Sequence, residues 1–158
     1  MKLQHEMTHL GLLGLTPFAI GAVAVWIAPY LIPRWAAMNV YQVVLIYGGV
    51  IAAYMAGAGA GALLISAKPA AERFLPGMIA TLVAWVAIWP PVFFISMDAF
   101  WRCSLLVGVL IYLLLRDLRA TDADGMPDWY GALRIRLTLW ASLFLSLIAV
   151  RMLLWGFV

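Results

Sequence analysis

Between residues 40 and 66 the sequence reads VYQVVLIYGGVIAAYMAGAGAGALLIS, a stretch without a single charged side chain. A helix needs about 20 mainly apolar residues to cross the hydrocarbon core of a bilayer, and this stretch exceeds that length. A strand of a membrane barrel would alternate apolar and polar residues, whereas here the apolar residues continue on every face. The stretch therefore predicts a transmembrane helix.

The composition extends this conclusion to the whole chain. Hydrophobic residues make up 66% of the 158 residues and charged residues 11%, and the mean hydropathy is +1.03. Ordinary soluble domains have about 45–50% apolar and about 25% charged residues, and a domain of this size has too little interior to bury the excess. In lipid, backbone polar groups must be paired within their own segment, which favours helices. The composition therefore predicts an all-α integral membrane protein.

Working outward from the first stretch, we predict a bundle of five transmembrane helices. They comprise residues 10–32, 40–66, 74–97, 99–115 and 133–158. The turn at residues 96–99 is so short that the third and fourth helices must be antiparallel neighbours. Residues 116–130 are polar and predict a loop, in which Asp122 and Asp124 form a solvated turn rather than a calcium site. No repeat or second domain is visible, so residues 1–158 form one transmembrane domain.

The distribution of cations predicts the orientation of the bundle, because cytoplasmic loops of membrane proteins are enriched in Lys and Arg. Arg151 is left out of the count because it lies inside the last predicted helix, and an N-terminus on the inside then leaves only Arg34 and Arg102 on the outside. The cations on the inside are then Lys2, Lys68, Arg73, Arg116, Arg119, Arg134 and Arg136. We therefore expect the N-terminus inside and the C-terminus outside. The ten cations are scattered between apolar runs, so the net charge of +3 does not indicate nucleic-acid binding.

One motif with catalytic potential lies near the N-terminus. His5-Glu6-Met7-Thr8-His9 matches the H-E-x-x-H pattern of zinc enzymes, in which two histidines on one helix face bind the metal and the glutamate is the general base. A catalytic zinc needs a third protein ligand, and the chain has no other histidine. We therefore predict no metal site, no catalytic residue and no cofactor. The missing histidines inside the spans also disfavour haem.

Three charged residues lie at or inside the predicted spans. Asp98 and Arg102, four residues apart, predict an ion pair at the membrane interface, with a gate as the alternative. Arg151 lies inside the last predicted helix. We expect it to extend to the outer headgroups, with a partner inside the bundle as the alternative. Cys103, the only cysteine, is expected to be a buried small hydrophobic residue.

Two features of the predicted second and third helices suggest close packing or binding. Ala53, Gly57 and Gly61 recur every four residues, which allows a neighbouring helix to approach closely. We expect this glycine face to pack inside the bundle, with a docking surface for another subunit as the alternative. Trp85 and Trp89 share a helix face that ends at residues 90–91, Pro-Pro, where a kink is either tolerated or lines a binding cavity.

Several segments together resemble a bacterial inner-membrane family catalogued as a domain of unknown function, which has a mitochondrial transmembrane relative. They are Gly11-Leu12-Leu13-Gly14-Leu15-Thr16-Pro17-Phe18, Tyr47-Gly48-Gly49-Val50-Ile51 with Ala56-Gly57 and Gly61, Leu75-Pro76 with Ala84-Trp85, and Asp124-Gly125-Met126-Pro127-Asp128-Trp129-Tyr130 with Leu133-Arg134 and Leu137-Thr138. The second-helix signature of the family often reads Gly-Gly-x-His-Trp-Gly, whereas this chain has Gly59 and Ala60 in place of His and Trp. The resemblance implies a small multi-helix membrane protein and no particular activity.

Three functions remain open on the sequence alone. The leading hypothesis is a non-enzymatic accessory or assembly subunit that docks on a larger complex of the bacterial inner membrane through the glycine face. The second is a binder or carrier of a small hydrophobic molecule, such as a quinone or a lipid, at the kink of residues 90–91. The third is a metal-dependent membrane enzyme that uses His5 and His9.

Overall fold

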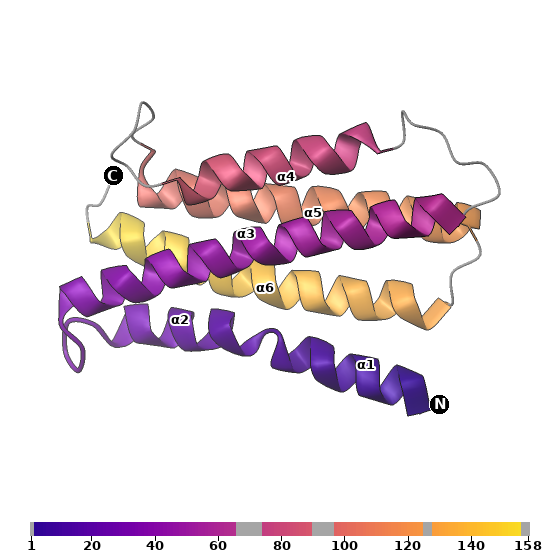
Figure 1. Ribbon diagram of the computed structural model, residues 1–158. Coiled ribbons are helices and arrows are strands. Elements are labelled where there is room, and N and C mark those ends of the chain that lie inside the picture. Colours follow the sequence, from indigo (N-terminus) through magenta and orange to yellow (C-terminus); the bar gives the residue numbers. More distant parts are fainter. Residues whose placement is uncertain (1, 66–73, 90–96, 125–127, 156–158) are drawn as a thin grey trace.

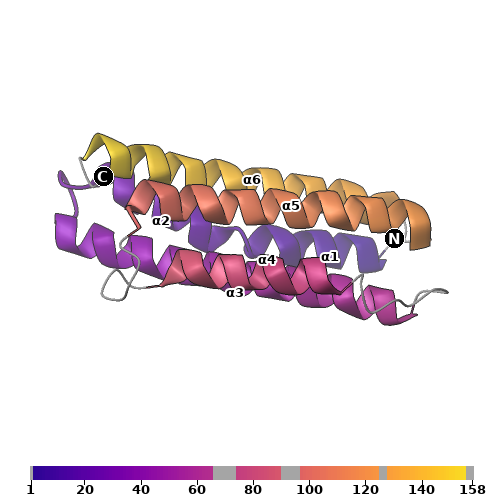
Figure 2. The same ribbon diagram turned by 90° about the horizontal axis from the view of Figure 1, so that it is seen from above.

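The computed structural model describes residues 2–65, 74–89, 97–124 and 128–155. Every regular element in these ranges is a helix, and the helices lie along one common long axis (Figure 1, Figure 2). The helices are α1 (Lys2–Leu13), α2 (Thr16–Ile27), α3 (Arg34–Ile65), α4 (Leu75–Ile88), α5 (Ala99–Asp124) and α6 (Asp128–Leu154). The predicted all-α bundle is confirmed.

Four segments of the described chain are long and apolar enough to cross a bilayer. They are His5–Ile27, which combines α1 and α2, Arg34–Gly61, Ala99–Arg119 and Trp129–Leu154. The apolar α4 has 14 residues, which at ~1.5 Å per residue span about 21 Å. The predicted third helix was to continue to Met97, but α4 ends at Ile88, and residues 90–96 lie outside the described ranges. The chain is a multi-pass helical membrane protein.

The start of α1 and the end of α6 lie at opposite ends of the bundle (Figure 1). We call these the N-terminal end and the C-terminal end. Five crossings require this arrangement, whereas four or six would bring both termini to one side. Which end faces the cytoplasm stays a prediction from the cation count.

Reporter fusions after Ala120 and after Val158 test the number of crossings. We expect the two reporters to lie on opposite sides of the membrane, with the Ala120 fusion in the cytoplasm, because only α6 separates the two points. Alkaline phosphatase and green fluorescent protein activities of the paired fusions measure the two locations. Two reporters on the same side would contradict the five-crossing arrangement.

The first span is broken, which differs from the single helix predicted over residues 10–32. Pro17 has no N–H to donate to the carbonyl of Leu13, and the Thr16 hydroxyl donates to that carbonyl instead, at 2.7 Å. The carbonyl of Gly14 accepts a hydrogen bond of 2.8 Å from the Tyr47 hydroxyl on α3. The break between α1 and α2 is therefore hydrogen-bonded, as backbone at membrane depth must be.

The loop predicted over residues 116–130 is wrong for most of its length. Helix α5 continues through residues 116–124, including the predicted turn at Asp122 and Asp124, and α6 begins at Asp128. The polar residues mark the point where α5 leaves the apolar layer of the membrane. The pairing of Asp117 on α5 with Arg134 on α6 stabilises the helix there. Polar composition alone does not distinguish a solvated helix end from a loop.

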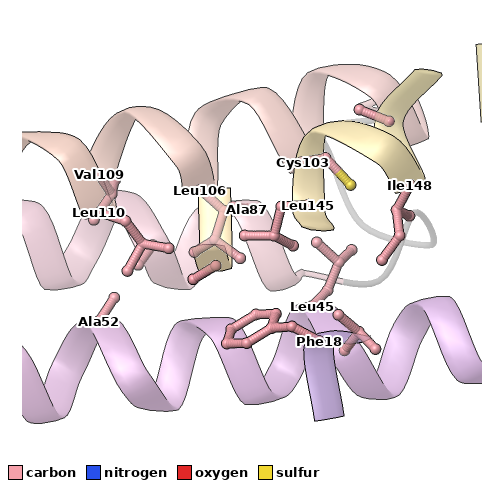
Figure 3. Close-up of a cluster of buried hydrophobic side chains, with 14 of the residues drawn as sticks. Phe18, Leu45, Ala52, Ala87, Cys103, Leu106, Val109, Leu110, Leu145 and Ile148 are labelled. Atoms are coloured by element: carbon pink, nitrogen blue, oxygen red, sulfur yellow. The ribbon is translucent and has the colours of Figure 1, made fainter. Parts of the chain in front are cut away.

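The core runs along the middle of the bundle, where every long helix contributes apolar side chains (Figure 3). Its fully buried members include Phe18 of α2, Leu45 of α3, Leu106 and Leu110 of α5, and Leu145 and Ile148 of α6. Cys103 is also fully buried, as predicted. This core holds α2, α3, α4, α5 and α6 together and leaves α1 at the edge of the bundle (Figure 1).

Close helix packing occurs at Gly48 and Gly49, not at the predicted Gly57 and Gly61. A side chain at Gly48 would meet Leu106 and the ring of Phe18, and one at Gly49 would meet Ile88 of α4. Gly57 and Gly61, by contrast, have no described atom within 4 Å of the position that a Cβ would take. The expectation that the glycine face packs inside the bundle is therefore wrong for the described residues.

Leucine substitutions on α3 separate these two classes of glycine. Gly48→Leu should destabilise the isolated protein by about 1–3 kcal/mol, because a large side chain must displace buried neighbours. Gly57→Leu places the same side chain on the same helix in open space and should leave stability unchanged. Thermal unfolding of the purified variants in a mild detergent measures the difference. Equal losses of stability in the two variants would contradict the packing described.

Candidate ligand site beneath the broken first span

The residues of the H-E-x-x-H motif lie on the outside of the molecule. His5, Glu6 and His9 are exposed on α1, at the N-terminal end of the bundle. Among the described residues, no three His, Cys, Asp or Glu side chains gather into a group that could hold a metal ion. The structure thus brings no third ligand to the two histidines from the described part of the chain.

Arg102, predicted to pair with Asp98, is directed to the end of α4. It is 3% exposed, and its Nε donates to the carbonyl of Ala87 at 2.8 Å while its Nη2 donates to that of Trp89 at 2.6 Å. The last carbonyls of a helix have no partner within the helix and form the negative end of its dipole. Arg102 donates hydrogen bonds to these carbonyls. The predicted ion pair between Arg102 and Asp98 is not found in the described residues.

Arg151 repeats this arrangement at the end of α2. Its Nη2 donates to the carbonyl of Ala28 at 2.7 Å, and its guanidinium carbon lies 5.4 Å from the ring centre of Trp26 and 4.9 Å from that of Trp155. The structure therefore shows the alternative that we considered, a partner inside the bundle. Both arginines donate hydrogen bonds to carbonyls at the C-terminal end of a helix, Arg102 at the end of α4 and Arg151 at the end of α2, so we assign them structural roles.

Trp85 and Trp89 share one face of α4, as predicted. Their ring centres are 4.7 Å apart, and the rings meet edge to face. Pro90 and Pro91, at which we predicted a kink or a binding cavity, lie outside the described residues. The structure instead contains a cavity in another place, which the sequence did not indicate.

A group of buried charges lies toward the N-terminal end of the bundle, where α5 meets α6. Asp117 is 6% exposed, and one of its oxygens, Oδ2, accepts a bond of 2.5 Å from Nη2 of Arg134. The other oxygen, Oδ1, lies 3.1 Å from Nη2 of Arg116. The single carboxylate of Asp117 is thus shared between two guanidinium groups. We call Arg116, Asp117 and Arg134 the charge cluster.

The Arg116 guanidinium fits between two helices because two glycines there have no side chain. A Cβ at Gly59 of α3 or at Gly77 of α4 would collide with the Arg116 guanidinium, which therefore lies between the two helices. Gly59 is also the position at which this chain departs from the resembled His-Trp signature. In this chain, glycine at that position makes room for a charged side chain from α5.

A cavity of about 340 Å³ lies beside the charge cluster, beneath the break between α1 and α2. Five helices and the break itself contribute to its wall. The lining residues are Met7, Leu10 and Gly11 of α1, Gly14 and Leu15 at the break, Phe18 of α2, Ile51, Tyr54, Met55 and Ala58 of α3, Leu110 of α5, and Trp129, Tyr130, Leu133, Arg134, Leu137, Thr138 and Ala141 of α6. The wall is mainly apolar.

Arg134 is the charged member of this wall. It is 9% exposed, and its guanidinium carbon lies 5.7 Å from the ring centre of Tyr130. Its Nη2 is bound to Asp117, but its Nε is buried and has no hydrogen-bond partner among the described residues. Leaving a buried donor unpaired costs about 1–3 kcal/mol, so this atom is suited to an acceptor from outside the chain.

The rim of the cavity consists of apolar and aromatic side chains that face outward. Leu10 is 64% exposed, Tyr54 is 73% exposed and Met7 is 48% exposed. All three belong to segments that are long and apolar enough to cross the bilayer. The opening between α1 and α3 is therefore directed sideways, toward lipid.

Three of the segments that carried the sequence resemblance meet at this cavity: Gly11–Phe18, Tyr47–Ile51 and the start of α6. A comparison with protein-family models finds a match to DUF3429, described as a protein of unknown function, over residues 3–150. No curated protein and no solved structure shows significant similarity to the chain. Because the match covers nearly the whole sequence and includes most of every described helix, the chain belongs to the DUF3429 family.

Proposed function

We propose that the protein binds a small amphipathic molecule of the bilayer, such as a quinone or a single-chain lipid, in the cavity beneath the α1–α2 break. The observation that carries this proposal is the cavity itself, which combines an apolar wall with one buried arginine. Ligand sites are typically concave and mainly apolar, with a few polar groups that fix orientation. The proposed site lies at another place than the kink predicted at residues 90–91, which is outside the described residues.

The size of the cavity limits the ligand. Small-molecule sites measure about 300–1,000 Å³, and a volume of about 340 Å³ lies near the lower limit. One acyl chain segment or one substituted ring fits this space, whereas the whole of a two-chain phospholipid does not. The sideways opening lets such a molecule enter from the membrane without crossing water.

A ligand retained through purification tests this proposal. Protein extracted in a mild detergent should contain a lipid-like molecule in near-stoichiometric amount, which mass spectrometry of the organic extract measures. Ala58→Phe places a ring at the wall of the cavity and should abolish retention, because the ring occupies the ligand's space.

Ala53→Phe is the matched control for that variant. It places the same ring on an exposed position of the same helix, outside the cavity, and should retain the ligand. A wild-type protein that contains no such molecule, and that also binds no added quinone or fatty acid, would contradict the proposed function.

The glycine face supports a second function, an accessory subunit of a larger complex in the bacterial inner membrane. Ala53 and Gly57 are exposed, and no described atom approaches the place of a Gly57 or Gly61 side chain. Lipid forms few dispersion contacts with such a surface, whereas a partner helix can approach it closely. Gly57→Leu should then release the protein from its complex in native gels while the isolated protein stays stable. Both proposed roles are non-enzymatic.

A further inference from the structure

We propose that the head of the bound molecule is an anion, a carboxylate or a phosphate, and that Arg134 binds it. This inference rests on the proposed function and adds the chemical class of the ligand. Three features of the site point to an anion: the net positive charge of the cluster, the Nε of Arg134 without a partner among the described residues, and the row of polar side chains on α6.

The charge cluster contains an excess of positive charge. Within the described residues it holds two guanidiniums, of Arg116 and Arg134, and one carboxylate, of Asp117. Asp117 and Arg134 are less than a tenth exposed. A buried charge without a counter-ion is strongly unfavourable in a medium of low dielectric constant. A ligand that carries one negative charge would balance the cluster, whereas a neutral ligand would leave the excess in place.

The donor geometry of Arg134 is suited to the same class of ligand. One edge of its guanidinium is bound to Asp117 through Nη2, and its Nε is buried without a partner among the described residues. Guanidinium groups form their strongest hydrogen bonds with carboxylate and phosphate oxygens, because both partners are charged. Since Arg134 also lines the cavity, an anionic head in the cavity can accept this hydrogen bond.

Two further polar side chains share the helix face of Arg134. Tyr130 precedes it by four residues and Thr138 follows it by four, and residues at this spacing lie above one another on a helix. All three line the cavity. Both neighbours carry a hydroxyl group, which can donate to an anionic oxygen. The face of α6 in the cavity thus has a polar row, while the facing residues Leu10, Leu15 and Phe18 are apolar. An amphipathic anion matches this division, with its head on α6 and its chain beneath the break.

Matched probes on the unaltered protein test the inference. The protein is reconstituted in phosphatidylcholine vesicles and titrated with brominated octadecanoate, with its methyl ester and with the corresponding octadecyl phosphate, at a pH at which the acids are ionised. Bromine quenches the fluorescence of nearby tryptophan, and Trp129 lines the cavity. The part of the quenching that Trp129→Phe abolishes reports binding at this site. The acid and the phosphate should reach half-saturation at about tenfold lower mole fraction than the ester, the factor that corresponds to ~1.4 kcal/mol.

The single variant Arg134→Gln tests the role of Arg134. It removes the guanidinium at the cavity, while Asp117 stays paired with Arg116, so neither remaining charge loses its counter-ion. In this variant the acid and the ester should bind equally, with the affinity of the ester unchanged. If the variant does not fold, the comparison of probes on the wild-type protein still decides the question.

The outcomes separate this inference from the proposed function. Equal binding of acid and ester to the wild-type protein would overturn the anionic head and leave the binding of a hydrophobic molecule intact. Absence of Trp129-dependent quenching by any of the three probes would overturn both. A phosphate that binds more tightly than the acid indicates a lipid phosphate as the source, and the reverse order indicates a fatty acid. Either order supports an anionic head.

Discussion

Asp117→Asn should destabilise the protein by about 3–5 kcal/mol, more than any other single substitution of a side chain at the N-terminal end of the bundle. The change preserves shape but removes the one carboxylate that faces Arg116 and Arg134, and breaking a buried pair leaves uncompensated charge. The change also weakens the link between α5 and α6 at this end of the bundle, because Arg134 is the partner on α6. Unfolding with increasing mole fraction of SDS in mixed micelles measures the effect.

The control for this prediction is Arg119→Gln. Arg119 is an exposed charge two residues further along α5, and its removal should change stability by no more than about 0.5 kcal/mol. A loss of similar size in the two variants would show that the buried pairs contribute nothing specific. The charge cluster would then have no structural importance.

Arg102→Met should have the second large effect, a loss of about 2–5 kcal/mol, because methionine fills the same space but leaves the carbonyls of Ala87 and Trp89 without donors. The end of α4 should become the first part of the bundle to open. Hydrogen exchange of the α4 amides, measured by mass spectrometry in detergent, should therefore increase in the variant. Arg136→Met, an exposed position on α6, is the control. Unchanged exchange in α4 of the Arg102 variant would contradict the assigned role.

Composition and the charge-free stretch at residues 40–66 were enough to predict the all-α membrane bundle. Both can be read without knowing how the helices pack, because hydrophobicity over about 20 residues decides whether a helix crosses the membrane. Helix ends were less accurate, because they depend on pairing between segments. The stretch 116–130 looks like a loop until Asp117 is known to lie next to Arg134, which is 17 residues away on another helix.

The break in the first span has a signal in the sequence. Pro17 lies inside the predicted helix 10–32, and Thr16 beside it can satisfy the carbonyl that proline leaves free. For the glycine face, the sequence signal predicts an internal contact that the described residues do not make. Small residues at a spacing of four indicate that a close approach is possible, but Gly57 and Gly61 face away from the described bundle, whereas Gly48 and Gly49 face its core. Spacing does not reveal which side of a helix faces inward when every side is apolar.

The cavity could not be predicted from any one segment. Most of its wall is formed by α1, α3 and α6. The cavity therefore depends on the relative position of these three helices, which are far apart in the sequence. The signal for its polar part was present, since Arg134 and Thr138 stand one helical turn apart in an apolar span. A charged residue inside a span usually has a function, whereas the cation count alone identifies Arg134 only as a flanking cation.

The most direct test of ligand binding beneath the broken span is a cross-linking map. A fatty acid with a photoreactive group in its chain is added to the protein in vesicles, irradiated, and located by mass spectrometry of the peptides. We expect labels on cavity residues of α1 and α6 that are partly buried, such as Gly11 and Leu137, and their loss when unlabelled fatty acid is in excess. Labels spread over outward-facing residues such as Val43 and Leu139, unaffected by unlabelled fatty acid, would contradict this expectation.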